Sequence, residues 1–193
     1  MAHLGITGGT NCVGFLVAPQ WVMTAAHCEG IHYVYLGGHH ISAEEPSQQA
    51  FRVVANYPHP QYEKVFSSND IRLLKLNSKA TLNEYVQILR LPEFDRDLSD
   101  GTPCSVAGWD WVYKGWSPNL TVFGRSRCKR KYHYYYNYGK LCSNGQSKTV
   151  FKGITGGPLV CNGVAEGIIL YRYPGIYTRI AHYLPWIKRT MNL

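Results

Sequence analysis

The chain has 193 residues, of which 45% are hydrophobic, and it contains 19 glycines and 10 prolines. This length is sufficient to bury a sizeable core, and the composition excludes disordered and fibrous proteins. The formal net charge of +8 is uneven, because residues 1–110 carry 11 acidic and 7 basic residues, a net of −4, whereas residues 111–193 carry one acid and 13 basic residues, a net of +12.

The basic second half favours a polyanionic partner such as a sulfated glycan or a phospholipid surface, although many secreted proteins have basic surfaces without such a role. The six cysteines allow fifteen disulfide connectivities, and no C-x-x-C zinc spacing occurs among them. We therefore expect structural disulfides, an oxidising compartment and no metal or cofactor. No apolar stretch approaches about 18 residues, which predicts no transmembrane segment. The first residues show no charged leader with an apolar run, so we expect any signal peptide to lie outside this sequence.

The first predicted elements are two short apolar strands, residues 15–18 and 21–24, which form a hairpin around Pro19-Gln20. They lead into Thr24-Ala25-Ala26-His27-Cys28, which resembles the histidine signature of chymotrypsin-like serine proteases. An isolated histidine usually has no catalytic role. Within this pentapeptide the resemblance implies that His27 is the general base, because imidazole can take up and return a proton near neutral pH.

Alternating residues such as 33–36 and 51–54 predict further short antiparallel strands of a barrel. The adjacent His39-His40 cannot easily converge on a metal without other ligands, so we expect no metal site there. Asp70 precedes the apolar run 71–76. The resemblance implies that its carboxylate accepts the Nδ1 proton of His27, although an Asn-Asp pair before a strand can also be a simple turn.

The acidic stretch 93–102 is predicted to be a solvated connection between two barrels, and Cys104 to Trp109 again resembles the family. Only nineteen positions separate Trp109 from Cys128, which indicates a shortened loop beside the substrate cleft. Asn119-Leu120-Thr121 is a glycosylation acceptor sequence and is consistent with secretion.

Residues 125–140 carry six Lys or Arg, five tyrosines and no acid. We expect an exposed loop here that holds sulfates or phosphates by charge while tyrosine rings lie on a carbohydrate or lipid surface. The candidate anion-binding residues are Arg125, Arg127, Lys129, Arg130 and Lys131. The alternative is a solvated basic loop whose tyrosines partly pack. A nucleic-acid partner is not expected for a secreted domain.

The segment from Phe151 to Cys161 resembles the active-site segment of the same family, with two changes. Thr155 stands where the family has its nucleophilic serine, and Ile154 stands where it has an aspartate. The resemblance implies an oxyanion hole made by the amides of Gly153 and residue 155, held in place by that aspartate paired with a freed N-terminus. The extra methyl group of Thr155 restricts its side chain, and Ile154 cannot form the ion pair.

The substrate cleft also departs from the family. Leu170 and Arg172 replace a serine and a glycine on either side of Tyr171, on the strand that would pair with substrate. Thr149, at the bottom of the specificity pocket, carries no charge. At the C-terminus, residues 181–191 predict an amphipathic helix. At the N-terminus, Met1 matches the family from a point about fourteen residues inside the domain, so we expect the activating terminus to be missing, through truncation or a natural start.

The resemblance covers most of the chain and is closest to granzymes, azurocidin-like neutrophil proteins and complement factor D. It implies an all-β fold of two packed antiparallel β-barrels with a C-terminal α-helix, forming a single peptidase-like domain. The expected limits are about 1–90 for the first barrel, 101–180 for the second and 181–191 for the helix. The implied disulfides are Cys12–Cys28, Cys104–Cys161 and Cys128–Cys142.

We expect an extracellular or secretory-granule monomer that is catalytically impaired or inactive and acts by binding a polyanionic surface or a protein partner. The first alternative is a weak endopeptidase with Thr155 as nucleophile and His27 and Asp70 as its catalytic partners. The second is a truncated product without a selected function.

Overall fold

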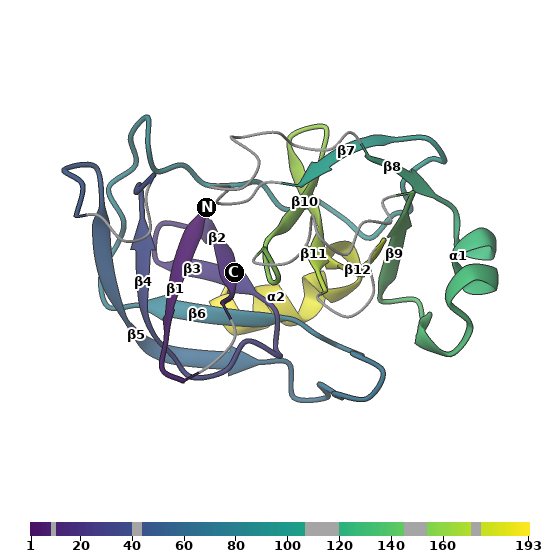
Figure 1. The fold of residues 1–193 in the computed structure, drawn as a ribbon, viewed down its shortest axis with the longest axis horizontal. Helices are drawn as coiled ribbons and strands as arrows, with labels where there is room; N and C mark the ends of the chain where they lie inside the picture. The colour runs from purple at the N-terminus through teal and green to yellow at the C-terminus, as the bar shows by residue number, and fades with distance from the viewer. Residues whose placement is uncertain (9–10, 40–43, 107–119, 145–153, 171–174) are drawn as a thin grey trace.

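In the computed structural model, the described residues are 1–8, 11–39, 44–106, 120–144, 154–170 and 175–193. They form two closed antiparallel barrels of six strands each, which lie side by side in Figure 1. The expected all-β architecture is therefore confirmed.

The first barrel has the strand order β1-β2-β3-β6-β5-β4. The predicted hairpin is present, since Phe15 of β2 pairs with Met23 of β3. The strands are β1 (Ala2–Ile6), β2 (Val13–Ala18), β3 (Trp21–Thr24), β4 (Ile31–Leu36), β5 (Gln49–Pro58) and β6 (Arg72–Leu76).

The second barrel has the strand order β10-β11-β12-β9-β8-β7. Its strands are β7 (Pro103–Val106), β8 (Leu120–Phe123), β9 (Lys140–Ser143), β10 (Pro158–Cys161), β11 (Val164–Ile169) and β12 (Ile176–Arg179). The segment just before β10 pairs with the end of β11, because the Gly156 N–H donates to the Ile169 carbonyl and the Ile169 N–H donates to the Gly157 carbonyl, both at 2.9 Å.

The C-terminal segment joins the second barrel to the core of the first. A short 3-10 helix η2 (Ile180–Tyr183) precedes α2 (Leu184–Met191), so the α-helix begins later than predicted. Pro185 lies in its first turn, a position that suits a residue without a backbone N–H. The predicted apolar face is confirmed, since Leu184, Ile187 and Met191 are buried in the core of the first barrel.

The basic segment, residues 125–140, does not form the loop that we predicted. The structure has a helix, α1 (Arg125–Tyr132), followed by the 3-10 turn η1 (His133–Tyr135), so the prediction of a loop is wrong. The stretch 125–132 contains no glycine or proline, arginine and lysine are good helix formers, and cations in the last turn suit the negative end of the helix dipole. Cys128 is the one buried residue of α1, which explains why no apolar stripe predicted the helix.

The acidic connection at residues 93–102 is bound to the second barrel. Asp95 accepts a 2.5 Å hydrogen bond from Arg179, and Asp97 binds Arg125 through two bonds of 2.6 and 2.7 Å. Both carboxylates remain about half exposed, as expected for a solvated connection. Their ion pairs with Arg125 and Arg179 attach this connection to the second half of the chain.

The three disulfides in the structure are Cys12–Cys28, Cys104–Cys161 and Cys128–Cys142, the pairing that the resemblance implied. The first lies in the barrel that holds His27, and the last joins α1 to β9. Within the described ranges, the helices are too short or too polar to cross a membrane.

Candidate active site

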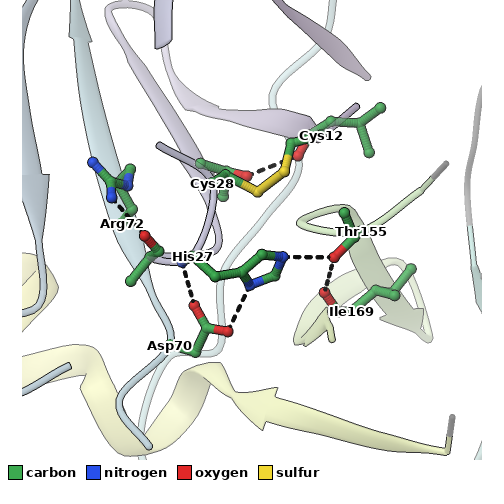
Figure 2. The surroundings of a disulfide bond; sticks show 10 residues. Cys12, His27, Cys28, Asp70, Arg72, Thr155 and Ile169 are labelled. Atoms are coloured by element: carbon green, nitrogen blue, oxygen red, sulfur yellow. Dashed lines mark hydrogen bonds and ion pairs between the residues drawn. A yellow bond between two sulfur atoms is a disulfide. The ribbon is translucent and has the colours of Figure 1, made fainter. Parts of the chain in front are cut away.

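Three side chains that are far apart in the sequence meet between the barrels. His27 follows β3, Asp70 precedes β6, and Thr155 precedes β10. Figure 2 shows the His27 ring between the other two side chains. The Nδ1 atom of His27 lies 2.7 Å from Asp70 Oδ2, and its Nε2 atom lies 2.9 Å from Thr155 Oγ1. The structure thus brings together the three side chains singled out in the sequence, with both contacts at hydrogen-bonding distance.

Asp70 is held so that it can orient the imidazole. Its side chain is 1% exposed, and its Oδ1 atom accepts the backbone N–H of His27 at 2.9 Å. Thr178 donates to the Asp70 carbonyl at 2.9 Å, which attaches this residue to the second barrel. With Nδ1–H donated to Asp70, the Nε2 atom is left to accept the hydroxyl proton of Thr155. This is the arrangement of nucleophile, base and orienting carboxylate that acyl transfer requires.

The conformation of the turn that carries Thr155 explains the glycine that follows it. Gly156 has a φ of 85°, and a Cβ atom there would collide with Thr24 Oγ1 and the Val13 carbonyl. The Val13 N–H donates to the Thr155 carbonyl at 3.0 Å, so this turn is bound to the first barrel as well as to β11. Thr155 is 3% exposed, and its hydroxyl also lies 3.5 Å from the Ile169 carbonyl.

Ile154 lies in an apolar cluster. Its side chain is 7% exposed and packs in the core of the second barrel, among residues that include Val13, Val106 and Leu159. The position at which the family has a charged carboxylate is therefore filled by hydrocarbon. Leu170 is likewise buried, in a separate cluster with Phe123 and Ile176.

Several predicted site residues lie outside the described part of the chain. They are Gly153, the expected oxyanion donor, the cleft residues Thr149, Tyr171 and Arg172, the glycosylation acceptor Asn119, and His40. Their assignments remain predictions. His39 is described, and its Nδ1 atom lies 3.9 Å from Glu45 on the surface.

Sequence reasoning missed two buried cations beside the catalytic pair. Arg72 donates to the Ala26 carbonyl at 2.5 Å and to Asn56 at 2.7 Å, next to the turn that carries His27 (Figure 2). Burial lowers its pKa, although Glu29 and Asp70 oppose this effect. Lys140 is 3% exposed and donates from Nζ to the Ser67 carbonyl. Its burial lowers its pKa to about 8. Of these two cations, only Arg72 could have been recognised as buried from the sequence, because it is a charged residue inside an aliphatic run.

The five candidate anion-binding residues do not form one uniform group. Arg125 is half-buried, bound to Asp97 and to the Tyr136 hydroxyl at 3.2 Å, and its guanidinium lies 4.9 Å from the centre of the Tyr138 ring. It is therefore engaged within the protein, which corrects its expected availability to a ligand. The other four, Arg127, Lys129, Arg130 and Lys131, are exposed on α1. Arg127 lies over the Phe123 ring, and the pKa of Lys131 is lowered by partial burial and by the charge of Arg127.

Among the described residues, three of the types that can bind a metal ion lie close together beside the site. The potential ligand atoms of Cys12, His27 and Cys28 lie within 4.8 Å of one another. The two sulfur atoms are joined in a disulfide, so they are not thiolates and cannot serve as zinc ligands.

Comparisons with a family profile, with relatives in sequence and with a solved structure all match over most or all of the chain. The profile of the family described as Trypsin matches residues 1–187. Granzyme H of Homo sapiens is 42% identical over 197 residues, covering 94% of this chain and 80% of the relative. Mast cell protease 3 of Ovis aries is 39% identical over 196 residues, covering 94% of this chain and 78% of the relative. A solved structure described as "Structure of GrC" superimposes with a TM-score of 0.85 at 37% identity, covering all of this chain and 92% of that one.

Proposed function

Because this chain belongs to the trypsin family, we propose that it is a chymotrypsin-like protease homologue that is strongly impaired in hydrolysis and acts by binding. The observation that carries the proposal is Ile154, which is buried in hydrocarbon beside an otherwise assembled group of Thr155, His27 and Asp70. The proton-handling pair is kept, while the nucleophile and the residue that would support the oxyanion site are altered.

The nucleophile is the first altered group. The Thr155 hydroxyl lies within reach of His27, but threonine has a second heavy atom on Cβ, which stiffens χ1. Thr155 is almost completely buried, so its methyl group must share a tightly packed space with the hydroxyl and the approaching carbonyl. Attack therefore has to take place with the methyl group in the space that the acyl carbon approaches.

The support of the oxyanion site is the second altered group. In active relatives a carboxylate at this position holds the preceding amide toward the substrate. Ile154 offers no charge and is packed with apolar residues. Loss of one oxyanion donor slows acyl transfer by a factor on the order of 10²–10³. The combination of Thr155 and Ile154 supports a protein that retains the geometry of a protease and very little of its rate.

The binding role is supported by the four exposed cations of α1, Arg127, Lys129, Arg130 and Lys131. This helix lies at the outer side of the second barrel, beyond β9, where a large surface could approach it (Figure 1). The second half of the chain has a single acid, Glu166, and it is buried. We propose a sulfated glycan or a similar polyanionic surface as the partner. The three disulfides support an extracellular or secretory-granule location.

Heparin chromatography tests the binding role. Changing Arg127, Lys129, Arg130 and Lys131 to glutamine should lower the salt concentration of elution. It should also reduce the slope of log affinity against log salt by about three. With fewer basic residues in contact with the glycan, fewer counterions are released from the glycan on binding. The matched control changes four exposed basic residues of the first half, Arg52, Lys64, Lys79 and Arg90, by the same charge. Equal losses in the two variants would indicate attraction by net charge alone and would contradict a site on α1.

A second candidate function is a weak endopeptidase that uses Thr155 as nucleophile. The 2.9 Å contact between Thr155 Oγ1 and His27 Nε2 favours it. It differs from the first proposal in predicting hydrolysis that depends on His27.

A further inference from the structure

We propose that Lys140 is a positioning residue for the catalytic pair: its buried ammonium fastens the loop that carries Asp70 to the second barrel and places a positive charge beside that carboxylate. The inference rests on the assembled triad of the proposed function. It concerns the geometry of the triad and not the rate of hydrolysis, so it can be tested without measuring turnover.

The loop before Asp70 needs external support. Ser67 and Asn69 have φ values of 51° and 55°, in the left-handed region that non-glycine residues seldom adopt. Such residues persist where surrounding contacts determine their conformation. Lys140 is the first residue of β9, and its Nζ atom donates to the Ser67 carbonyl across 73 positions of sequence.

Each residue of this loop is bound by the second half of the chain. Asn137 lies 3.4 Å from the Ser68 hydroxyl, and the Tyr183 hydroxyl donates to Asn69 at 3.1 Å. Thr178 donates to the Asp70 carbonyl at 2.9 Å. These three partners are uncharged at neutral pH, whereas Lys140 brings a charge into the same buried region.

This attachment bears on catalysis because the triad is divided between the barrels. His27 and Asp70 belong to the first barrel, while Thr155 precedes a strand of the second. A contact that fixes the Asp70 loop to the second barrel therefore sets the distance between His27 Nε2 and Thr155 Oγ1. Lys140 and Thr178, which are paired in register on β9 and β12, provide two adjacent attachments.

The charge of Lys140 acts on Asp70 from within this contact. Burial lowers the pKa of Lys140 to about 8, and the attraction of Asp70 opposes that effect. Arg72 on β6 and Tyr183 on η2 also interact electrostatically with Asp70, and His27 is hydrogen-bonded to it. Of the first two, Arg72 stays charged through the neutral range, and burial raises the pKa of Tyr183. Of Lys140, Arg72 and Tyr183, Lys140 is thus the group that loses its charge near pH 8, while an imidazole also exchanges a proton near neutral pH.

The test is proton NMR of the whole chain between pH 6 and 10, following the downfield resonance of the His27 Nδ1 proton bound to Asp70. The resonance is assigned by its loss in Asp70→Asn. In the unaltered protein we expect a step in its position with a midpoint at about pH 8, separate from the step that protonation of the imidazole itself produces nearer to neutral pH. In Lys140→Met the step near pH 8 should be absent while the imidazole step remains, and in Lys140→Arg, which keeps its charge, the position below the pH 8 step should persist to pH 10.

Lys79→Met, an exposed charge on the first barrel, is the matched control and should follow the unaltered protein. The proposal is overturned if Lys140→Met retains the change near pH 8, or if no such change occurs in the unaltered protein. If Lys140→Met does not fold, Lys140→Arg decides alone: a change at pH 8 in that variant also overturns the proposal. A purely structural role for Lys140 would not produce this pH dependence. Absence of heparin binding or the presence of turnover would contradict the proposed function and leave this result unaffected.

Discussion

Replacing Ile154 with aspartate is expected to lower the free energy of unfolding at pH 7 by about 3 kcal/mol, because it places an unpaired carboxylate in a buried site. The Ile154 side chain is 7% exposed and packs among apolar residues of the second barrel. A charge there loses its hydration, and the described residues of this cluster offer it no charged side chain. Urea unfolding followed by tryptophan fluorescence measures the change.

Ile154→Val is the matched control, since it removes one methylene without adding charge and should cost about 1 kcal/mol. The loss caused by Ile154→Asp should be smaller at pH 4, where burial keeps the new carboxyl protonated, and should grow as the pH rises to 7. If Ile154→Asp is as stable as the unaltered protein at pH 7, a cation must lie within reach of this position. The argument from Ile154 to an unsupported oxyanion site would then be wrong.

Replacing Thr155 with serine is expected to raise the turnover of peptide thioesters about tenfold. The variant removes the methyl group that restricts the nucleophile, and an unfavourable rotamer costs on the order of 1 kcal/mol, which is close to a factor of ten in rate. The serine hydroxyl can occupy the Thr155 Oγ1 position, 2.9 Å from His27 Nε2. A panel of thioesters with different side chains avoids dependence on an unknown specificity.

The control for this measurement is Thr155→Ala, which has no hydroxyl and should not rise above the background rate. A burst of thiol release in Thr155→Ser, equal to the enzyme concentration, would identify an acyl-enzyme. If Thr155→Ser and Thr155→Ala are equally inactive, the methyl group is not a limiting defect, and the assignment of Thr155 as the altered nucleophile would be contradicted.

Much of the fold could be predicted because its signatures are local. The pentapeptide around His27, the position of Asp70 before an apolar strand and the glycines after Thr155 each reflect a short-range requirement. Gly156 illustrates this, since its φ of 85° is a local backbone conformation that favours glycine. The pairing of the cysteines needed the family resemblance, because six thiols alone leave fifteen connectivities open.

The features that escaped prediction depend on contacts between distant residues. Lys140 and Ser67 are 73 positions apart, and Arg72 and Ala26 are 46 apart, so no sequence window contains both partners. The helix α1 was missed because it buries a single cysteine and shows no apolar periodicity. Arg125 is unavailable to a ligand because it pairs with Asp97, a residue that we predicted to lie in a solvated connection.

The most direct test of the central claim compares thioester hydrolysis by the unaltered chain and by His27→Ala. An assembled triad with an altered nucleophile and an unsupported oxyanion site predicts rates that agree within a factor of about ten, because the base has no effective attack to assist. A rate for the unaltered chain that exceeds that of His27→Ala by about 10²–10⁴, the usual contribution of a general base, would contradict this account and establish a working endopeptidase.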